Sequence, residues 1–267
     1  MTRATLHRAR VSGDSGPWLV MAHGLGGSPA QWDPFVEAFR GTHRVLTFAQ
    51  AGSVDADPRA FSVARHSSTL GFADDLSLLC GELGLQDAVF IGHSIGGNAG
   101  VLASVGAPRL FSRLVLINSS PCYVDDDTTG YHGGLSREGL AALLDSAAAD
   151  YQTWAGGFGE LVMGNPEKPE YAEQFVSTLR KLDPEVAAVA FRAAFTADFR
   201  TSLPRLVVPT LVLQSQEDPA VPMETARWMA AQIPAARMVE LPTTGHFPHL
   251  IDPDGVLEAI RPFVLGR

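Results

Sequence analysis

At 267 residues, with 46% of them hydrophobic, the chain is long and apolar enough to form a large globular domain with a full core. Its formal net charge of −9 argues against binding to nucleic acid or to an anionic membrane, because no basic face is supplied. Two cysteines, Cys80 and Cys122, are too few for a disulfide framework, and no His or Cys spacing suggests a metal or cofactor site. Residues 1–10 lack the apolar stretch of a signal peptide and no run is long enough to span a membrane, so we expect a cytoplasmic protein.

Six short apolar runs, separated by stretches with helical spacing, predict an α/β fold with a mostly parallel, doubly wound sheet. Continuous rather than alternating hydrophobic runs are typical of strands that are covered on both faces. The alternation of strand and helix patterns predicts βαβ units. The six runs are residues 18–24, 44–49, 88–93, 113–119, 210–215 and 237–242.

One segment, residues 121–203, contains no strand pattern. Four helical patterns follow one another there, with turn residues and prolines at their starts. An all-helical insert between two strands predicts a cap over the strand ends, so we expect residues 1–120 and 204–267 to form the core. The four patterns are residues 136–149, 151–163, 169–182 and 184–197.

The stretch GHSIG, residues 92–96, matches the G-x-S-x-G motif after a predicted strand and before a predicted helix. A serine at such a sharp turn is strained and exposed, and the glycines let neighbouring backbone pass close to it. The start of the following helix favours negative charge that develops beside the serine. We therefore predict that Ser94 is a nucleophile rather than part of a structural glycine turn.

A serine nucleophile needs a base and an acid, in the chain order serine, acid, histidine. Asp218 follows a strand in QSQEDPAVP, while Glu217 lies nearer the strand end, where we expect it to face solvent. His246 follows a glycine in TGHFPHL, and we expect His249 to be structural. His93 adjoins the serine, but we expect it to point elsewhere on the turn.

Acyl transfer also needs N–H donors for the oxyanion. The backbone of Ile95, directly after Ser94, would supply one, and HGLGGS would supply the other from Leu25. GLGGSP does not fit a dinucleotide loop, because Pro29 stands at the third glycine and no acidic residue ends the next strand. It does not fit a phosphate-binding P-loop either, because the Gly-Lys-Ser/Thr ending is missing.

HGLGGSPAQW, GHSIGG and GHFPHL resemble the α/β-hydrolase superfamily. YQTWAGGFGELVMG and AAFTADFRTSLPRLVVPTLVLQSQEDPAVP narrow the resemblance to the group with the bacterial stress-response hydrolase RsbQ and the plant strigolactone and karrikin receptors. This resemblance implies a four-helix V-shaped cap, inserted after the sixth strand, over a hydrophobic pocket. It also implies a triad of Ser94, His246 and Asp218 that acts on small lipophilic esters or butenolide-type lactones. Leu25 stands where the family often has an aromatic residue, and GHSIGG-NAG also departs from the usual pattern, so the substrate class stays open.

Aromatic residues in the cap either pack its helices together or line a pocket for an apolar ligand. Trp154 and Phe158 lie four residues apart, as do Phe191 and Phe195, so each pair shares a helix face. Tyr123 would offer a hydroxyl at the cap entrance. The pattern alone leaves both interpretations open. The resemblance favours Trp154, Phe158 and Phe195 as lining, and leaves Phe191 undecided between the two.

The leading functional hypothesis is a cofactor-free serine hydrolase acting on a small apolar ester or lactone. A second hypothesis is a sensor that binds or slowly cleaves a small ligand and signals to a partner protein through its cap. A carbon–carbon bond hydrolase acting on ring-cleavage products would use the same triad, and it remains a third hypothesis.

Overall fold

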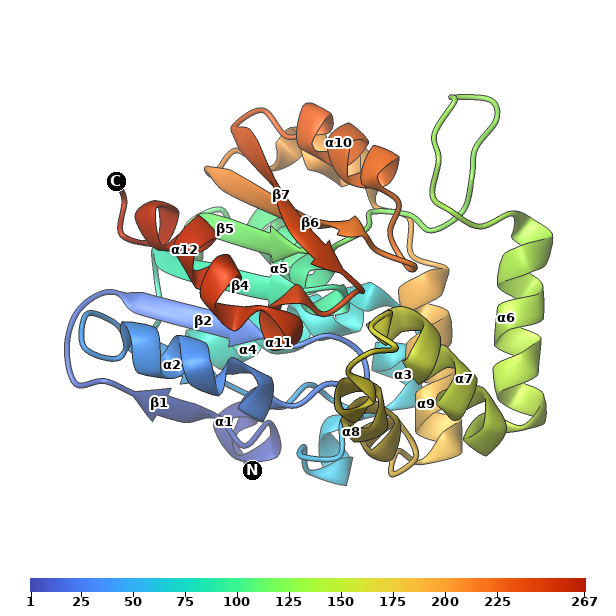
Figure 1. Ribbon diagram of the computed structural model, residues 1–267. Coiled ribbons are helices and arrows are strands. Elements are labelled where there is room, and N and C mark those ends of the chain that lie inside the picture. Colours follow the sequence, from blue (N-terminus) through green and yellow to red (C-terminus); the bar gives the residue numbers. More distant parts are fainter.

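A seven-stranded sheet runs through the computed structural model, which describes residues 1–267 (Figure 1). Its strand order is β1-β3-β2-β4-β5-β6-β7, and every neighbouring pair is parallel except β1 with β3. All six predicted strands are present. The strands are β1 (Arg10–Ser12), β2 (Trp18–Ala22), β3 (Arg44–Thr47), β4 (Ala88–His93), β5 (Phe111–Ile117), β6 (Thr210–Glu217) and β7 (Ala236–Thr244).

The sequence patterns missed β1, which has three residues and lies at the sheet edge. Its residues are exposed or half-buried, so it carries no continuous apolar run. By contrast, all six residues of β4, at the centre of the sheet, are buried. The hydrophobic pattern therefore missed the short edge strand without an apolar run, whereas β7, at the other edge, was predicted although only two of its residues are buried.

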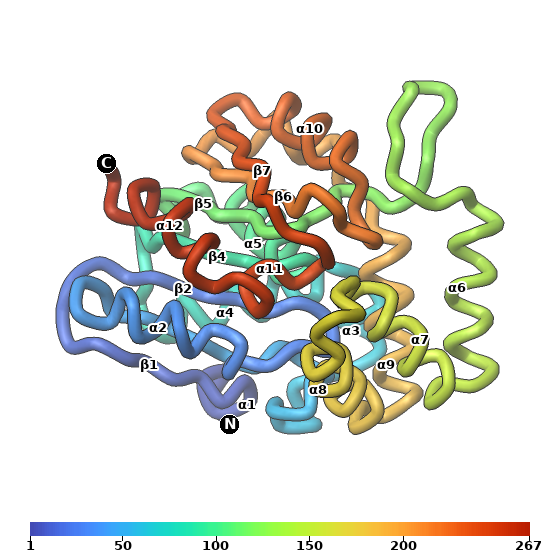
Figure 2. Tube along the Cα trace, in the orientation of Figure 1, coloured from blue at the N-terminus to red at the C-terminus, as the bar shows by residue number.

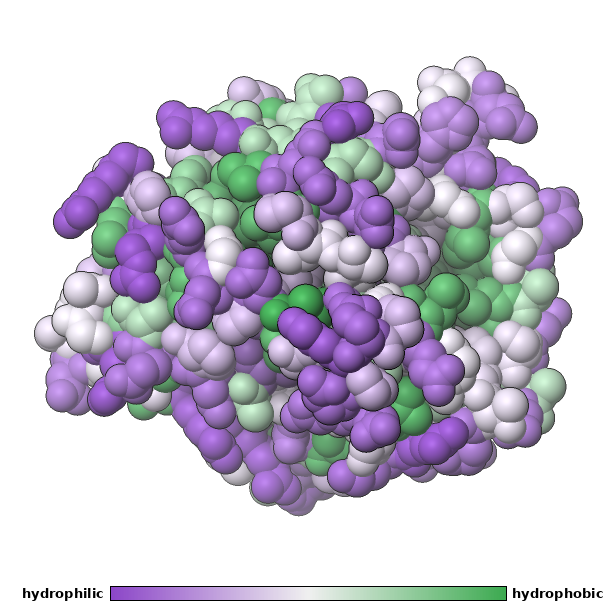
Figure 3. Space-filling model, viewed as in Figure 1, coloured by the Kyte–Doolittle hydropathy of each residue, from purple (hydrophilic) through white to green (hydrophobic).

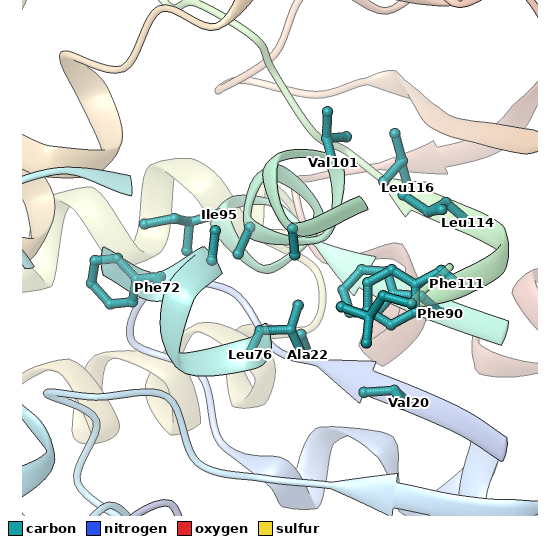
Figure 4. Close-up of a cluster of buried hydrophobic side chains, with 14 of the residues drawn as sticks. Val20, Ala22, Phe72, Leu76, Phe90, Ile95, Val101, Phe111, Leu114 and Leu116 are labelled. Carbon is teal, nitrogen blue, oxygen red and sulfur yellow. The ribbon is translucent and has the colours of Figure 1, made fainter. Parts of the chain in front are cut away.

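Helices cover both faces of the sheet. Two hydrophobic clusters form, one with side chains of α4, α5 and α10, and the other with side chains of α2 and α12. Figure 4 shows part of the first cluster, between α4, α5 and the strands. The helices outside the cap are α1 (Arg3–Leu6), α2 (Asp33–Phe39), α3 (Val63–His66), α4 (Thr69–Glu82), α5 (Ile95–Gly106), α10 (Met223–Gln232), α11 (Pro248–Ile251) and α12 (Pro253–Val264), with 3-10 turns η1 (Pro29–Trp32), η2 (Pro58–Ala60) and η3 (Arg200–Arg205).

The predicted helical insert is present between β5 and β6. Counted along this chain it follows the fifth strand, not a sixth as the resemblance implied. Figure 2 shows α7, α8 and α9 together, with α6 at the outer edge, and in Figure 1 the parallel strands point toward them. The cap helices are α6 (Arg137–Ala149), α7 (Tyr151–Met163), α8 (Pro169–Leu179) and α9 (Pro184–Phe195).

Side-chain caps and prolines explain why the four cap helices begin where they do. The side chains of Ser136, Asp150 and Asp183 accept backbone N–H groups at the starts of α6, α7 and α9. Prolines occupy the first turn of α8 and α9. These local signals account for the helix starts, which agree with the starts of the four sequence patterns to within one residue.

Polar residues cover most of the face in Figure 3, and apolar residues form scattered patches on it. None of the helices combines the length and the apolar character needed to cross a bilayer. Cys80 and Cys122 are both buried free thiols.

Candidate active site

Ser94 lies at a strained turn between β4 and α5. Its backbone has φ 52° and ψ −125°, a conformation that non-glycine residues rarely adopt. The turn is possible because Gly96 passes close to β2: a Cβ there would lie 2.5 Å from the Ala22 carbonyl oxygen. The strand–turn–helix geometry that the G-x-S-x-G motif predicts is therefore present around Ser94.

Asp218 follows β6 and forms a hydrogen-bonded pair with His246. The His246 Nδ1 lies 2.9 Å from Asp218 Oδ2 and 3.1 Å from Oδ1. The Asp218 side chain is fully buried, and its oxygens also accept the Ala220 N–H at 2.8 Å and the Gln214 Nε2 at 3.2 Å. Because Nδ1 faces the carboxylate, its proton is held there, and Nε2 keeps a lone pair that can accept a proton.

Glu217, the other candidate acid, has a different environment. It is exposed, and its Oε2 accepts the Thr244 hydroxyl at 3.0 Å. The register of β6 against β7 shifts between Ser215 and Glu217, which is typical of a β-bulge that changes where side chains point. The structure pairs His246 with Asp218 and not with Glu217.

The cap holds the His246 loop by one backbone hydrogen bond and one from the Asn165 side chain. The His246 N–H donates to the carbonyl oxygen of Val162, in the last turn of α7, at 2.8 Å. The Asn165 amide donates to the Thr244 carbonyl oxygen at 2.9 Å and to the Met163 carbonyl oxygen at 2.8 Å. The position of His246 therefore depends on the end of α7 as well as on the sheet.

The predicted oxyanion donors come from two loops at the same strand ends. Ile95 is the first residue of α5, where N–H groups have no partner within the helix. The Leu25 N–H makes no hydrogen bond within the chain. The Leu25 loop approaches the turn closely because Gly24 has no side chain: a Cβ there would lie 2.5 Å from the His93 Nδ1 and 3.2 Å from the Ser94 Cβ.

Ser94 and His246 line one small cavity of about 30 Å³, called here the Ser94 cavity. Ten of its thirteen lining residues are hydrophobic. The volume holds roughly one or two water molecules, so a larger ligand requires lining side chains or cap helices to move. The lining residues are Leu25, His93, Ser94, Tyr123, Phe158, Val162, Phe175, Phe191, Ala194, Phe195, Ala220, His246 and Phe247. A larger groove, about 1080 Å³, lies on α7 and α8, and none of the predicted site residues lines it.

Four of the five predicted pocket residues line the Ser94 cavity: Tyr123, Phe158, Phe191 and Phe195. Trp154 does not. Its ring stacks on Phe158, with centroids 4.6 Å apart, and meets the edge of Phe191 at 4.7 Å. Helical spacing places Trp154 and Phe158 on one face of α7, but only Phe158 reaches the cavity. Trp154 supports the lining from behind.

The Tyr123 hydroxyl remains protonated beside the site. Burial raises the pKa of Tyr123 to about 12; the Ser94 side chain opposes this shift, and the charge of Asp218 adds to it. A protonated phenol is a hydrogen-bond donor, so Tyr123 can contribute one polar contact in an otherwise apolar lining.

The expectation that His93 points elsewhere on the turn is wrong. His93 lines the cavity, and its Nε2 lies 2.7 Å from the His246 carbonyl oxygen. Burial, together with the neighbouring His249 and His246, holds the His93 pKa well below its usual range, so the ring is neutral and donates from Nε2. His249 is fully buried and stacks on Trp32, outside the cavity.

Sequence reasoning also missed five apolar lining residues. Only Phe247 carried a signal, because it adjoins His246. The others come from α7, α8, α9 and the loop after β6, and no motif marks them. The five are Val162, Phe175, Ala194, Ala220 and Phe247. No group of three or more His, Cys, Asp and Glu side chains is placed to hold a metal ion.

Comparisons with known proteins identify the family of the chain. The chain is 32% identical over 256 residues to "Probable esterase D14L" of Oryza sativa, covering 95% of this chain and 94% of that protein. It is 30% identical over 255 residues to "Karrikin insensitive 2 receptor CA" of Petunia hybrida, covering 95% and 94%. A solved hydrolase from Oleispira antarctica superposes with a TM-score of 0.95 at 26% identity, covering 99% of this chain and 97% of that one. Residues 19–259 match the alpha/beta hydrolase family, and the chain therefore belongs to that family.

Proposed function

We propose that the protein is a cofactor-free serine hydrolase that cleaves a small, largely apolar ester or lactone. One observation carries the proposal: Ser94 at a strained turn and His246, whose Nδ1 lies 2.9 Å from Asp218 Oδ2, line the same apolar cavity. A strained serine turn, a histidine with its Nδ1 held by a carboxylate, and nearby backbone donors are the parts that acyl transfer requires.

The reaction proceeds in two steps. His246 Nε2 takes the proton of the Ser94 hydroxyl as its oxygen attacks the substrate carbonyl, and the N–H groups of Leu25 and Ile95 bind the oxyanion. The alcohol leaves with the proton from His246, and an acyl ester remains on Ser94. His246 then takes a proton from water, the hydroxide attacks the acyl ester, and the acid leaves as Ser94 regains its proton.

The lining of the cavity supports an apolar substrate, since phenylalanines supply most of its large side chains. The printed description of the rice relative, a probable esterase, supports ester chemistry. For a lactone, the leaving alcohol stays attached to the acyl group, so cleavage gives a single hydroxy acid.

A second candidate function, a ligand sensor, is favoured by the contact between cap and histidine loop. The Val162 carbonyl and the Asn165 side-chain amide form hydrogen bonds with the segment that carries His246. A ligand that shifts His246 therefore also displaces the end of α7. The petunia relative is described as a receptor. If the protein acts as a sensor, acylation or ligand binding should change amide hydrogen exchange in residues 160–166; unchanged exchange there would count against this function.

Ser94→Ala tests the hydrolase proposal. The variant should lose activity on p-nitrophenyl acetate and butyrate by about 10⁵-fold or more, because no nucleophile remains. Its melting temperature should stay close to wild type, because the Ser94 side chain accounts for little packing. Ser112→Ala, on β5 far along the strand from the site, is the matched control and should keep wild-type turnover. An active Ser94→Ala variant would show that Ser94 is not the nucleophile.

A further inference from the structure

A second small cavity lies beside the Ser94 cavity. It has a volume of about 20 Å³, and Gln50 lines it, so it is called here the Gln50 cavity. Leu25 and Phe191 line both cavities and therefore stand between them. Ile95 lines the Gln50 cavity too, beside Phe72, and Figure 4 shows these two side chains next to each other. Both predicted oxyanion residues, Leu25 and Ile95, thus border the Gln50 cavity.

The Gln50 cavity differs from the Ser94 cavity in having a fixed, buried amide in its wall. The Gln50 residue is 6% exposed. Its backbone N–H donates to the His23 Nε2 at 3.0 Å, and its side-chain Nε2 donates to the His23 carbonyl oxygen. Both ends of Gln50 are therefore bonded to one residue of the oxyanion loop, which fixes the orientation of its amide.

The state of His23 supports this orientation. Its Nδ1 lies 2.8 Å from the Gly24 carbonyl oxygen, so Nδ1 carries the proton and Nε2 is the acceptor. Burial lowers the pKa of His23 to about 4, so the ring is neutral near pH 7. Rotating the Gln50 amide would place its oxygen against the His23 carbonyl oxygen, which is repulsive, so the nitrogen stays on that side.

The Gln50 Oε1 accepts no hydrogen bond within the chain, and it is not among the fully buried side-chain atoms that lack a partner, so it is accessible to a small donor. An amide oxygen can accept up to two hydrogen bonds, so a water molecule or a ligand hydroxyl or N–H group can pair with this accessible oxygen. The hydroxyl of Ser53, which also lines this cavity, donates to the Gln50 backbone oxygen at 2.8 Å and not to Oε1. The wall of the cavity thus presents an acceptor that a ligand can satisfy.

We propose that the Gln50 cavity is a substrate subsite that binds a hydroxyl or N–H group on the acyl part of the substrate, with Gln50 Oε1 as the acceptor. The inference rests on the proposed function and narrows its substrate class to hydroxylated or amide-bearing acyl groups. The Leu25 and Ile95 N–H groups hold the carbonyl oxygen, and the acyl chain extends past Leu25 and Phe191 into the Gln50 cavity. At about 20 Å³ the cavity holds roughly one water, so the chain enters only as the Phe191 or Leu25 side chain turns aside.

The test compares matched esters in wild type and in Gln50→Met, which keeps the side-chain length and removes the acceptor. The first pair of substrates is p-nitrophenyl butyrate and p-nitrophenyl β-hydroxybutyrate. The second pair is p-nitrophenyl hexanoate and p-nitrophenyl ω-hydroxyhexanoate. For each pair, the measured ratio is kcat/KM of the hydroxylated ester divided by kcat/KM of the unsubstituted ester. For at least one pair, Gln50→Met should lower this ratio by about tenfold, which is the effect of losing one hydrogen bond. Equal ratios in wild type and variant for both pairs would overturn the proposal, leaving a bound water as the partner of Oε1.

Two further variants keep the test decisive. Ser53→Ala is the matched control, and its ratios should stay within about twofold of wild type, because its hydroxyl is already bonded to Gln50. A drop with Ser53→Ala and none with Gln50→Met would overturn the assignment of Gln50. If Gln50→Met does not fold, Phe191→Ala opens the passage without touching Gln50 and should raise the ratio; an unchanged or lower ratio overturns the proposal. Failure of the proposed function has a different signature, since wild type would then cleave none of the four esters.

Discussion

Two buried aspartate–histidine pairs lie in different regions of this molecule. Asp218 Oδ2 lies 2.9 Å from the His246 Nδ1 at the strand ends under the cap. Asp75 Oδ2, on α4, lies 2.8 Å from the fully buried His66 Nε2. By distance and burial alone the two pairs are nearly the same.

The charges around the two aspartates differ. Asp75 also forms ion pairs with Arg3, at 3.0 Å, and with Arg65, so its charge is already balanced. Asp218 has no arginine or lysine partner, and only neutral N–H groups accompany His246 on its oxygens. Its negative charge therefore remains available to stabilise a positive charge that forms on His246.

Access to a cavity also differs. His246 and Ser94 line the same cavity. His66 is packed against Phe61 and Phe72, and it lines none of the three cavities described above. An aspartate–histidine pair is thus no evidence of catalysis by itself. The surrounding charge and a space for substrate distinguish a candidate catalytic pair from a structural one.

The largest effect that separates the two pairs should come from Asp218→Asn. This change disfavours the Nδ1-protonated ring of His246 and removes the charge that stabilises its protonated form, so kcat should fall by about 10⁴-fold. Glu217→Gln is the matched control and should change kcat by less than about twofold, because Glu217 is exposed and bonded to Thr244. Steady-state kinetics on p-nitrophenyl butyrate measure both. A large loss with Glu217→Gln and little change with Asp218→Asn would identify Glu217 as the acid that supports His246.

Asp75→Asn should affect stability and not catalysis. It leaves Arg3 and Arg65 without their counter-charge and should lower the free energy of unfolding by about 3 kcal/mol. Urea unfolding measures this, and kcat/KM below the transition should match wild type. The exposed neighbour Asp74→Asn is the control, with little change expected in either quantity. Loss of activity at unchanged stability would mean that Asp75 has a role in the site.

The histidines near His246 lack acidic partners, and this predicts a pH dependence of stability. Burial, with the nearby His246 and His23, lowers the pKa of His249 to about 3. The folded state therefore keeps this ring neutral while the unfolded state takes up a proton below about pH 6.5. Its contribution to stability is complete above pH 6.5 and is lost as pH falls toward 3, by about 1.4 kcal/mol per pH unit.

His249→Leu tests this pH dependence by urea unfolding at several pH values between 7 and 4. The slope of unfolding free energy against pH should become shallower by about 1.4 kcal/mol per unit. His132→Leu changes an exposed histidine and serves as the control, with the wild-type slope expected. An unaltered slope in His249→Leu would show that this ring is not held neutral.

The smallest expected effect is a change in acyl-chain preference, which depends on the Ser94 cavity that His246 lines. Wild type should prefer short acyl esters, with kcat/KM rising briefly with chain length and then collapsing once the volume is filled. Phe158→Ala opens the cavity and should move the optimum to longer chains, since each newly buried methylene contributes about fourfold. Some stability should be lost to the space created. Leu161→Ala, an exposed position on the same helix, should keep the wild-type profile. An identical profile in Phe158→Ala would mean that this ring only packs the cap.

Most of the fold could be predicted from local sequence patterns. The pattern at 151–163 matches α7 residue for residue, because the Asp150 cap and the helical spacing are both local signals. The pattern at 169–182 ran three residues beyond α8, which ends at Leu179. Helix ends without a strong stop signal depend on what they pack against, and a sequence pattern does not contain that information.

The sequence alone determined the chemical groups of the candidate site: a serine in a G-x-S-x-G turn, then an acid, then a histidine after a glycine. These signals are local, because backbone strain at the turn and the order along the chain need no knowledge of packing. Tertiary structure decided which groups meet. It brought His93 to the His246 carbonyl, placed Trp154 behind Phe158, and turned Gln50 toward a second cavity. Those positions depend on contacts between residues far apart in the chain, such as Gln50 with His23, and side-chain direction there is set by packing rather than by any spacing in the sequence.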